Sequence, residues 1–136
     1  SDGTTADLTM GATDDVDVIE ASLTFTGAAG QTDRPAAENP LLINNTGNQV
    51  YTSISLTAYN LTSGANVLGA EQFNVNVTDS AAGEALIHDS AVPITGAALD
   101  KGVSGQEEIY FYLDIPSGLP SATYNSGSNW IIDPAV

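Results

Sequence analysis

Apolar residues in this chain recur at every second position, and this period of two is the feature that most constrains the fold. The clearest run covers residues 109–115, where Ile109, Phe111 and Leu113 share one parity and two tyrosines and an aspartate take the other. Successive side chains of a β-strand point to opposite faces, so this spacing predicts a strand with one buried face. No stretch shows the 3.6-residue spacing of a sustained amphipathic helix. The pattern therefore predicts an all-β protein.

Further segments with the same alternation divide the chain into short strands. The stronger segments are residues 19–25, 50–58, 73–77 and 130–132, and the weaker ones are residues 41–43 and 86–87. Turn-forming residues separate them, as at 61–66, and the alanine-rich segment 81–99 is compatible with a short helical turn. Short strands spaced in this way predict an antiparallel two-sheet β-sandwich of about 7–9 strands, immunoglobulin-like or jelly-roll-like.

The charge of the chain restricts its partners. Only two cations, Arg34 and Lys101, stand against 17 carboxylates, which gives a formal net charge of -15, and there is no cysteine. Such a charge repels nucleic-acid phosphates and anionic membrane surfaces. No run reaches the roughly 18 apolar residues of a membrane-inserted helix. The uncharged polar residues are mainly Ser, Thr and Asn, which points to an extracellular or cell-surface protein without nucleic-acid or membrane partners.

Residues 1–18 form an N-terminal segment with a strand pattern of its own, ahead of a sandwich domain at residues 19–136. Ala6, Leu8 and Met10 alternate with polar residues in this segment. A polar terminus normally frays unless something holds it. In one hypothesis the segment is the first strand of its own sandwich. In the other it is a donor strand, and these three side chains insert into a neighbouring subunit.

The sequence lacks the residue patterns of common active sites. His88 is the only histidine, and a lone histidine is more often a surface residue than a base or a ligand. No serine lies in a G-x-S-x-G motif, and no phosphate-binding or H-E-x-x-H motif occurs. A glycosidase would need paired carboxylates among aromatic platforms, and the chain has one tryptophan. We therefore predict a protein that is not an enzyme and holds no cofactor.

Acidic residues gather just before residue 19. Asp14, Asp15 and Asp17 supply the hard oxygen ligands that Ca²⁺ prefers. The ligand spacing of an EF-hand is absent, so a solvated acidic loop is the favoured interpretation. These three residues remain the weak candidate calcium ligands of the sequence.

Three N-x-[ST] sequons, at Asn44, Asn60 and Asn76, are candidate N-glycosylation sites. We expect Asn44 in a loop, Asn60 at the junction of a strand and a turn, and Asn76 on the polar parity of its strand. Sugar at such positions would cover a solvent-facing surface without disturbing the core. In an exported chain these residues predict N-linked glycans.

Tyrosines lie opposite the aliphatic parity of two predicted strands. They are Tyr51, Tyr59, Tyr110 and Tyr112. If those strands are neighbours, the rings form an exposed aromatic patch that would bind carbohydrate or pack against another subunit. Cross-strand pairing on a partly buried sheet face explains the same pattern equally well.

Two stretches together resemble a known class of protein. Residues 45–64 begin with N-T-G-N and end with N-L-T-S-G, and residues 109–124 end with I-P-x-G-x-P-x-x-T-Y. This combination resembles the immunoglobulin-like β-sandwich modules of archaeal secreted and cell-surface proteins, and the similarity covers roughly residues 41–133. The chain departs from that pattern at residues 125–129, which are loop-like where such modules run into a longer final strand.

The resemblance implies a structural role. A short final strand leaves an open edge or gap, and the N-terminal segment of the next subunit would fill it by β-strand addition. Such an arrangement resembles the donor-strand fibres of some bacterial biofilm and archaeal pilus subunits. The expectation is a homopolymeric cell-surface filament, thread or sheath. The alternative is a carbohydrate- or calcium-binding accessory module of a larger surface protein.

Overall fold

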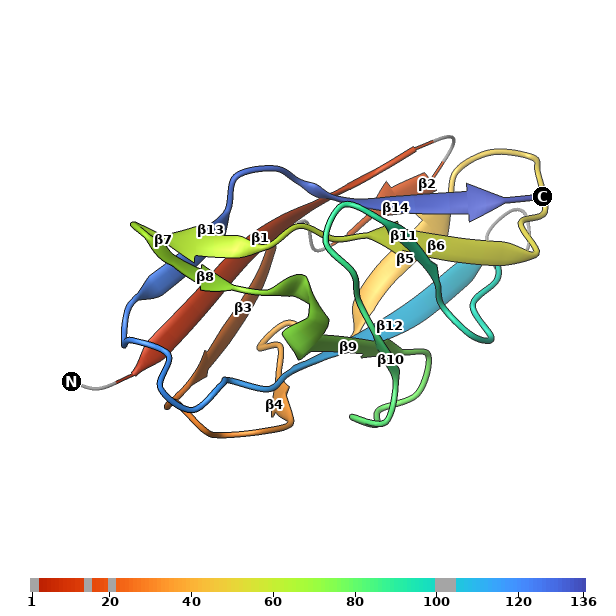
Figure 1. Cartoon of the computed structure of the whole chain (residues 1–136). Helices are drawn as coiled ribbons and strands as arrows, with labels where there is room; N and C mark the ends of the chain where they lie inside the picture. Colours follow the sequence, from red (N-terminus) through yellow and green to blue (C-terminus); the bar gives the residue numbers. More distant parts are fainter. Residues whose placement is uncertain (1–2, 14–15, 20–21, 100–104) are drawn as a thin grey trace.

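Two β-sheets share one apolar core in the computed structural model, which describes residues 3–13, 16–19, 22–99 and 105–136 (Figure 1). The larger sheet contains eight strands, namely β1 (Thr4–Ala12), β3 (Ser22–Gly27), β6 (Ser53–Thr57), β7 (Leu61–Ser63), β8 (Asn66–Leu68), β11 (Ala91–Pro93), β13 (Thr123–Ser126) and β14 (Trp130–Ala135). The smaller sheet contains six, namely β2 (Val16–Val18), β4 (Arg34–Pro35), β5 (Leu41–Asn45), β9 (Phe73–Asn76), β10 (Glu84–Ala85) and β12 (Gln106–Leu113).

The all-β, two-sheet prediction is confirmed, but the expected number of 7–9 strands is too low, because the described residues form 14. The additional strands are short. Six of them, β2, β4, β7, β8, β10 and β11, have only two or three residues. An alternation over only two or three residues is a weak signal in a sequence, and none of these six strands was predicted at its observed position. No helix in the described part of the chain is long and apolar enough to cross a membrane.

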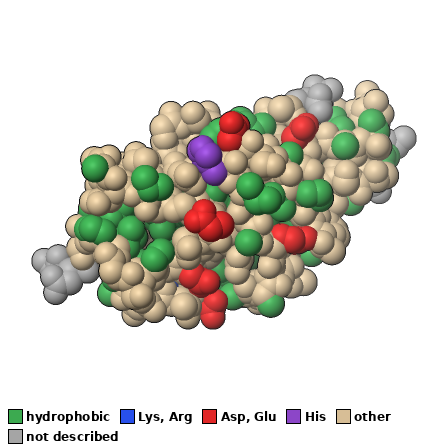
Figure 2. All heavy atoms as spheres, in the orientation of Figure 1, with side chains coloured by type: hydrophobic (Ala, Val, Ile, Leu, Met, Phe, Trp, Pro, Cys, Tyr) green, Lys and Arg blue, Asp and Glu red, His purple; other side chains and the backbone are tan. Residues whose placement is uncertain are grey.

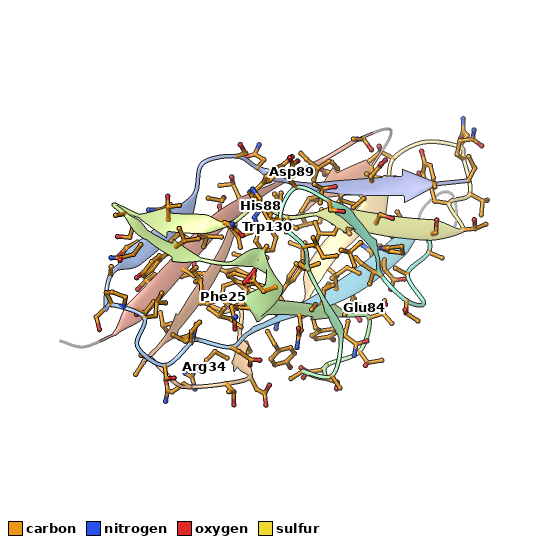
Figure 3. All side chains as sticks on the ribbon, in the orientation of Figure 1. Phe25, Arg34, Glu84, His88, Asp89 and Trp130 are labelled. Carbon is orange, nitrogen blue, oxygen red and sulfur yellow. The ribbon has the colours of Figure 1, made fainter. Side chains whose placement is uncertain are left out.

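The core is built where the inner faces of both sheets meet. Phe73 of the smaller sheet packs edge-to-face against Phe25 and Trp130 of the larger sheet, with ring centroids 5.2 Å and 5.1 Å apart (Figure 3). All three side chains are at most 1% exposed. The indole Nε1 of Trp130 donates to the carbonyl oxygen of Tyr59 at 3.0 Å. Aromatic burial and a satisfied indole therefore connect the two sheets.

The predicted inward parity fails at the beginning of two strands. Ile19 lies before β3 and is 47% exposed, and Val50 lies before β6 and is 43% exposed. Tyr51 is buried instead, because its backbone exchanges two hydrogen bonds with that of Leu99. This bridge fixes Tyr51 independently of β6, so the alternation of β6 does not extend to it.

Residues 61–99 differ from the sequence prediction in two places. The predicted turn at 61–66 is a tight hairpin of β7 and β8, in which Gly64 adopts a φ of +61° that other residues rarely take. The predicted helical turn at 81–99 is wrong, because β10 and β11 occupy parts of that segment. A single 3₁₀ turn lies earlier, at Ala70–Gln72.

The final strand is longer than predicted. It was expected at 130–132, and β14 continues to Ala135 because it pairs with β6 from Ile131 to Ala135. Pro134 is tolerated there, since it lies beyond the residues of β14 that also pair with β1. The side of β14 that was expected to be open is occupied by β1 of the same chain.

The free edge of β3 is covered by the segment at residues 34–38. The backbone N–H of Thr24 donates to Oε1 of Glu38 at 2.8 Å, and the carbonyl of Thr24 accepts from the N–H of Ala37 at 2.9 Å. Arg34 Nε donates to the carbonyl of Thr26 at 3.1 Å. These contacts satisfy backbone groups that would otherwise be open to pairing with another strand.

Thr4 provides a test of how β1 sits in the core. Its side chain is 1% exposed, and its hydroxyl has no hydrogen-bond partner in the described part of the chain. Thr4→Val replaces this hydroxyl by a methyl group of similar shape, so we expect the free energy of unfolding to rise by about 1 kcal/mol. Urea denaturation measures the change. Thr5→Val, on the outward parity, is the matched control and should shift stability by less than about 0.5 kcal/mol. If the Thr4→Val protein were less stable, the Thr4 hydroxyl could not be a buried group without a hydrogen-bond partner.

Candidate functional site

β1 lies between three strands that are otherwise separate in the larger sheet. Residues Thr4–Thr9 pair antiparallel with β3, Thr5–Asp7 pair parallel with β13, and Met10–Ala12 pair parallel with β14. The strand order is β11-β6-β14-β1-β13-β7-β8, with β3 attached through β1 alone. Figure 1 shows β1 as the long red strand that crosses this sheet. We call the space between β3, β13 and β14 that holds this strand the β1 slot.

The inward side chains of β1 fill the slot with apolar groups. Ala6, Leu8 and Met10 are 0%, 2% and 5% exposed, and Thr4 continues their parity. All four belong to one face of the strand, as its alternating burial shows. The sequence prediction selected the first three, and extending the same parity by one step identifies Thr4.

Backbone and side-chain hydrogen bonds hold both ends of β1 in its slot. At the start of the strand, the N–H of Thr5 donates to the carbonyl of Ala122 at 3.0 Å. Just beyond its end, the N–H of Thr13 donates to the carbonyl of Ile132 at 2.9 Å, and its hydroxyl donates to Oδ1 of Asp133 at 2.8 Å. The strand is therefore anchored along its whole length and not only through its apolar side chains.

A shallow pocket marks the point where β1 changes partners from β13 to β14. Its volume is about 160 Å³, and its lining residues are Asp7, Leu8, Thr9, Ser22, Asn125 and Ser126. The buried hydroxyl of Ser126 has no hydrogen-bond partner in the described part of the chain.

The structure of the single chain places Ala6, Leu8 and Met10 in the core of their own subunit. This arrangement corresponds to the hypothesis that the N-terminal segment is the first strand of its own fold. Insertion of the same residues into a neighbouring subunit stays a prediction. The two arrangements use the same side chains and the same slot.

Asp14, Asp15 and Asp17 are the candidate calcium ligands of the sequence. Asp14 and Asp15 lie outside the described residues, and Asp17 is exposed on β2, opposite Asn44 of β5. Among the described residues, no group of three or more His, Cys, Asp or Glu side chains is arranged to hold a metal ion.

His88 supports a chain connection. Its Nδ1 accepts the backbone N–H of Asn60 at 2.9 Å, and its ring meets that of Tyr59 edge-on with centroids 5.8 Å apart. The next residue, Asp89, donates its N–H to the carbonyl of Ala58 at 2.7 Å. These contacts fasten the link between β6 and β7 to residues 88–89 (Figure 3).

The four tyrosines do not form one patch, because β6, which Tyr51 and Tyr59 flank, and β12 belong to different sheets. Tyr51 is buried, and Tyr59 packs beside His88. Only Tyr110 and Tyr112 lie together, on the outer face of β12, where they stand opposite asparagines of β9. Burial, followed by the charge of Glu108, raises the pKa of Tyr110 above its usual value.

Carboxylates take a role that the sequence did not predict. Several accept backbone N–H groups of loops or strand edges, at 2.8–2.9 Å: Glu38 from Thr24, Glu84 from Thr95, Glu107 from Ala98 and Asp114 from Asp33. Figure 2 shows the acidic side chains of one face as separate groups among uncharged surface. These four carboxylates therefore support loops and strand edges.

Comparison of the chain with protein-family models, with curated protein sequences and with solved structures found no significant match. The β1 slot and the Tyr110–Tyr112 face are consequently the two features on which a function can be argued.

The Tyr112–Asp79 contact can be tested by titration. The hydroxyl of Tyr112 donates to Oδ1 of Asp79, and this hydrogen bond, with burial, raises the pKa of Tyr112 to about 12. Because the pKa of Tyr112 is higher in the folded than in the unfolded protein, its hydrogen bond to Asp79 stabilises the fold fully below about pH 10. This stabilisation is lost between about pH 10 and 12. Asp79→Ala should return the pKa toward 10, as followed by tyrosinate absorbance. Asp114→Ala is the matched control and should leave the pKa of Tyr112 raised. An unchanged titration in Asp79→Ala would contradict the assigned cause.

Proposed function

We propose that this chain is the structural subunit of an extracellular cell-surface filament (a pilus, thread or sheath) in which β1 of one copy occupies the β1 slot of the next. One observation carries the proposal: the N-terminal strand is the central strand of the larger sheet. Without β1, the larger sheet would consist of three parts that do not pair with one another, namely β11-β6-β14, β13-β7-β8 and β3. The slot therefore requires a strand, and any copy of the chain carries one that fits.

Exchange of β1 between copies preserves its interactions. Every backbone hydrogen bond and every buried side chain of β1 is available equally from the same subunit or from a neighbour. The interaction energies therefore nearly cancel, and the main difference is the entropy of association, as in domain swapping. Repeated from copy to copy, exchange in one direction is heterologous and gives an open filament.

Other routes of strand pairing are restricted. Glu38 and Arg34 cover the free edge of β3, and β11, at one end of the larger sheet, contains Pro93. Edges with these features resist pairing with another chain. At -15 per subunit, copies also repel one another over a Debye length of about 10 Å at 0.1 M salt. Apolar insertion and backbone pairing at the β1 slot fit these restrictions.

The finer assignment of the fold belongs to the same proposal. An immunoglobulin-like β-sandwich of the archaeal cell-surface type is consistent with two sheets whose inner faces share the Phe25–Phe73–Trp130 contact. The N-terminal segment then serves as the donor strand, and the remainder serves as the acceptor.

The alternative is a carbohydrate-binding module of a larger surface protein, and it is favoured by the outer face of β12. There Tyr110 and Tyr112 lie beside Asn74 and Asn76, a combination of ring faces and amides that suits sugars. This alternative predicts a monomer with glycan affinity measurable by calorimetry.

Removal of the donor strand tests the proposal directly. A chain that lacks residues 1–12 has an empty slot, so we expect it to form no filaments in negative-stain microscopy. A synthetic peptide of residues 1–13 should bind the truncated chain and block assembly of the full chain, because it supplies the missing backbone pairs. The same peptide with Leu8→Asp is the control and should not bind, since it places a charge in the apolar slot. Filaments formed by the truncated chain would overturn the proposal.

A disulfide test does not depend on the truncated chain folding. Thr9 and Ser22 are exposed and face each other across β1 and β3, and the chain has no cysteine of its own. Oxidised filaments of Thr9→Cys/Ser22→Cys should give a ladder of covalent multimers on a non-reducing gel. The control pair Ser53→Cys/Ala135→Cys joins β6 to β14 and should crosslink only within a chain. Filaments in which the first pair also links only within chains would show that β1 is not exchanged.

A further inference from the structure

The three sequons differ in how the folded chain presents them. Asn44 lies inside β5, where it pairs with Gln106 on one side and Asp17 on the other, and its Oδ1 is buried. An oligosaccharyl-transferring enzyme must take the acceptor segment into its own binding groove. Freeing Asn44 for such a groove would break pairings on both sides of the strand.

The second sequon is equally restrained. Leu61, its middle residue, is 0% exposed, and Thr62 pairs with Val67 on one side and Asn125 on the other. Oδ1 of Asn60 accepts the backbone N–H of Ala70 at 2.8 Å. Access to Asn60 would require the opening of β7 and the removal of Leu61 from the core.

The third sequon leaves the sheet. Asn76 is the last residue of β9 and pairs only with Tyr110 of β12. Val77 and Thr78 lie beyond the strand and belong to no ladder, and Thr78 is exposed. Val77 packs in part against the core, so entry of this acceptor segment into an enzyme groove displaces one half-buried side chain, while β9 stays paired.

The local conformation at Asn76 is also that of a turn. The backbone N–H of Thr78 donates to Oδ1 of Asn76 at 3.3 Å, which is an Asx turn. Nδ2 of Asn76 is the atom that must act as the nucleophile. Nδ2 itself makes no hydrogen bond within the described part of the chain.

From these contacts we infer that Asn76 is the N-glycosylation site of the folded chain and that its glycan covers the Tyr110–Tyr112 face. The donor is an oligosaccharide linked to a lipid diphosphate. Nδ2 of Asn76 bonds to the anomeric carbon, and the bond from that carbon to the diphosphate oxygen breaks. The diphosphate keeps the electron pair, and one Nδ2 proton passes to the enzyme's base. The inference rests on the proposed function only in requiring an exported chain.

The position of Asn76 determines what the glycan would contact. Tyr110 is its direct partner across the ladder, and Tyr112 lies two residues further along the same face of β12. Asp79 accepts the hydroxyl of Tyr112, which ties the segment after the sequon to that face. A sugar on Asn76 would lie against tyrosine rings, a favourable contact for the apolar face of a pyranose.

The test compares the folded chain with peptides. The full chain, made in a bacterium without N-glycosylation, is incubated with a purified single-subunit oligosaccharyltransferase and a lipid-linked oligosaccharide. We expect one glycan per chain by intact mass, located at Asn76 by peptide mapping, with at least tenfold faster modification than at Asn44 or Asn60. Synthetic peptides that span each sequon control for intrinsic sequence preference and should be modified at similar rates.

Matched variants sharpen the result. Asn76→Gln and Thr78→Ala should both abolish modification of the folded chain, whereas Thr78→Ser should retain it. Asn74 lies on the same face of β9 but outside a sequon, so the Asn74→Gln variant should be glycosylated at Asn76 to the same extent as the unaltered chain. Equal modification of all three sequons in the folded chain, or modification of the Asn76 peptide but not of folded Asn76, would overturn the inference. Filament assembly of unmodified chains is scored separately by microscopy, so failure here and failure of the proposed function are distinguishable.

Discussion

The pairing of β1 with strands from both ends of the chain is the interaction on which the larger sheet depends. β3 begins ten residues after β1 ends, whereas Thr5 pairs with Thr123 and Met10 pairs with Trp130. β1 therefore joins a local antiparallel neighbour to two distant parallel ones. Its inward side chains enter the core to which Phe25 and Trp130 also belong. Loss of this one strand would remove backbone partners from three others and expose the apolar interior, which is why it is the natural element for exchange between copies.

The shortage of cations gives the carboxylates a different structural role from the usual one. Arg34, the cation within the described part of the chain, donates to a backbone carbonyl. Glu38, Glu84 and Glu107 accept backbone N–H groups. A carboxylate that accepts such a donor supports a loop without needing a positive partner, and charge-assisted bonds of this kind are stronger than neutral ones. The remaining acid lies on the surface, where it opposes close approach of copies unless salt or bound cations screen it.

The sequence predicted the parts of the fold that are long and locally regular. The alternation of Ile109, Phe111 and Leu113 identified β12, and that of Ala6, Leu8 and Met10 identified β1, because in both strands one face is buried over most of its length. It failed where position is set by non-local contacts. The Tyr51–Leu99 bridge reverses the expected parity before β6. The assignment of β6 and β12 to different sheets separates tyrosines that share a sequence pattern. The three sequons are equivalent as sequence motifs. They differ in how far strand pairing restrains the residues around each asparagine, and only the structure shows this.

The order in which the partners of β1 are synthesised bears on whether it pairs in cis or in trans. β1 is made first, but β13 and β14 come last, more than a hundred residues later. Closing so long a loop is entropically costly and slow compared with local pairing. Until β13 and β14 have been made, β1 of a new chain can pair with β3, while its other edge has neither of these partners. In the filament that we propose, the slot of a neighbouring copy would already be present at high local concentration. The topology therefore gives trans pairing a kinetic advantage in a crowded setting, while a dilute chain has time to fill its own slot.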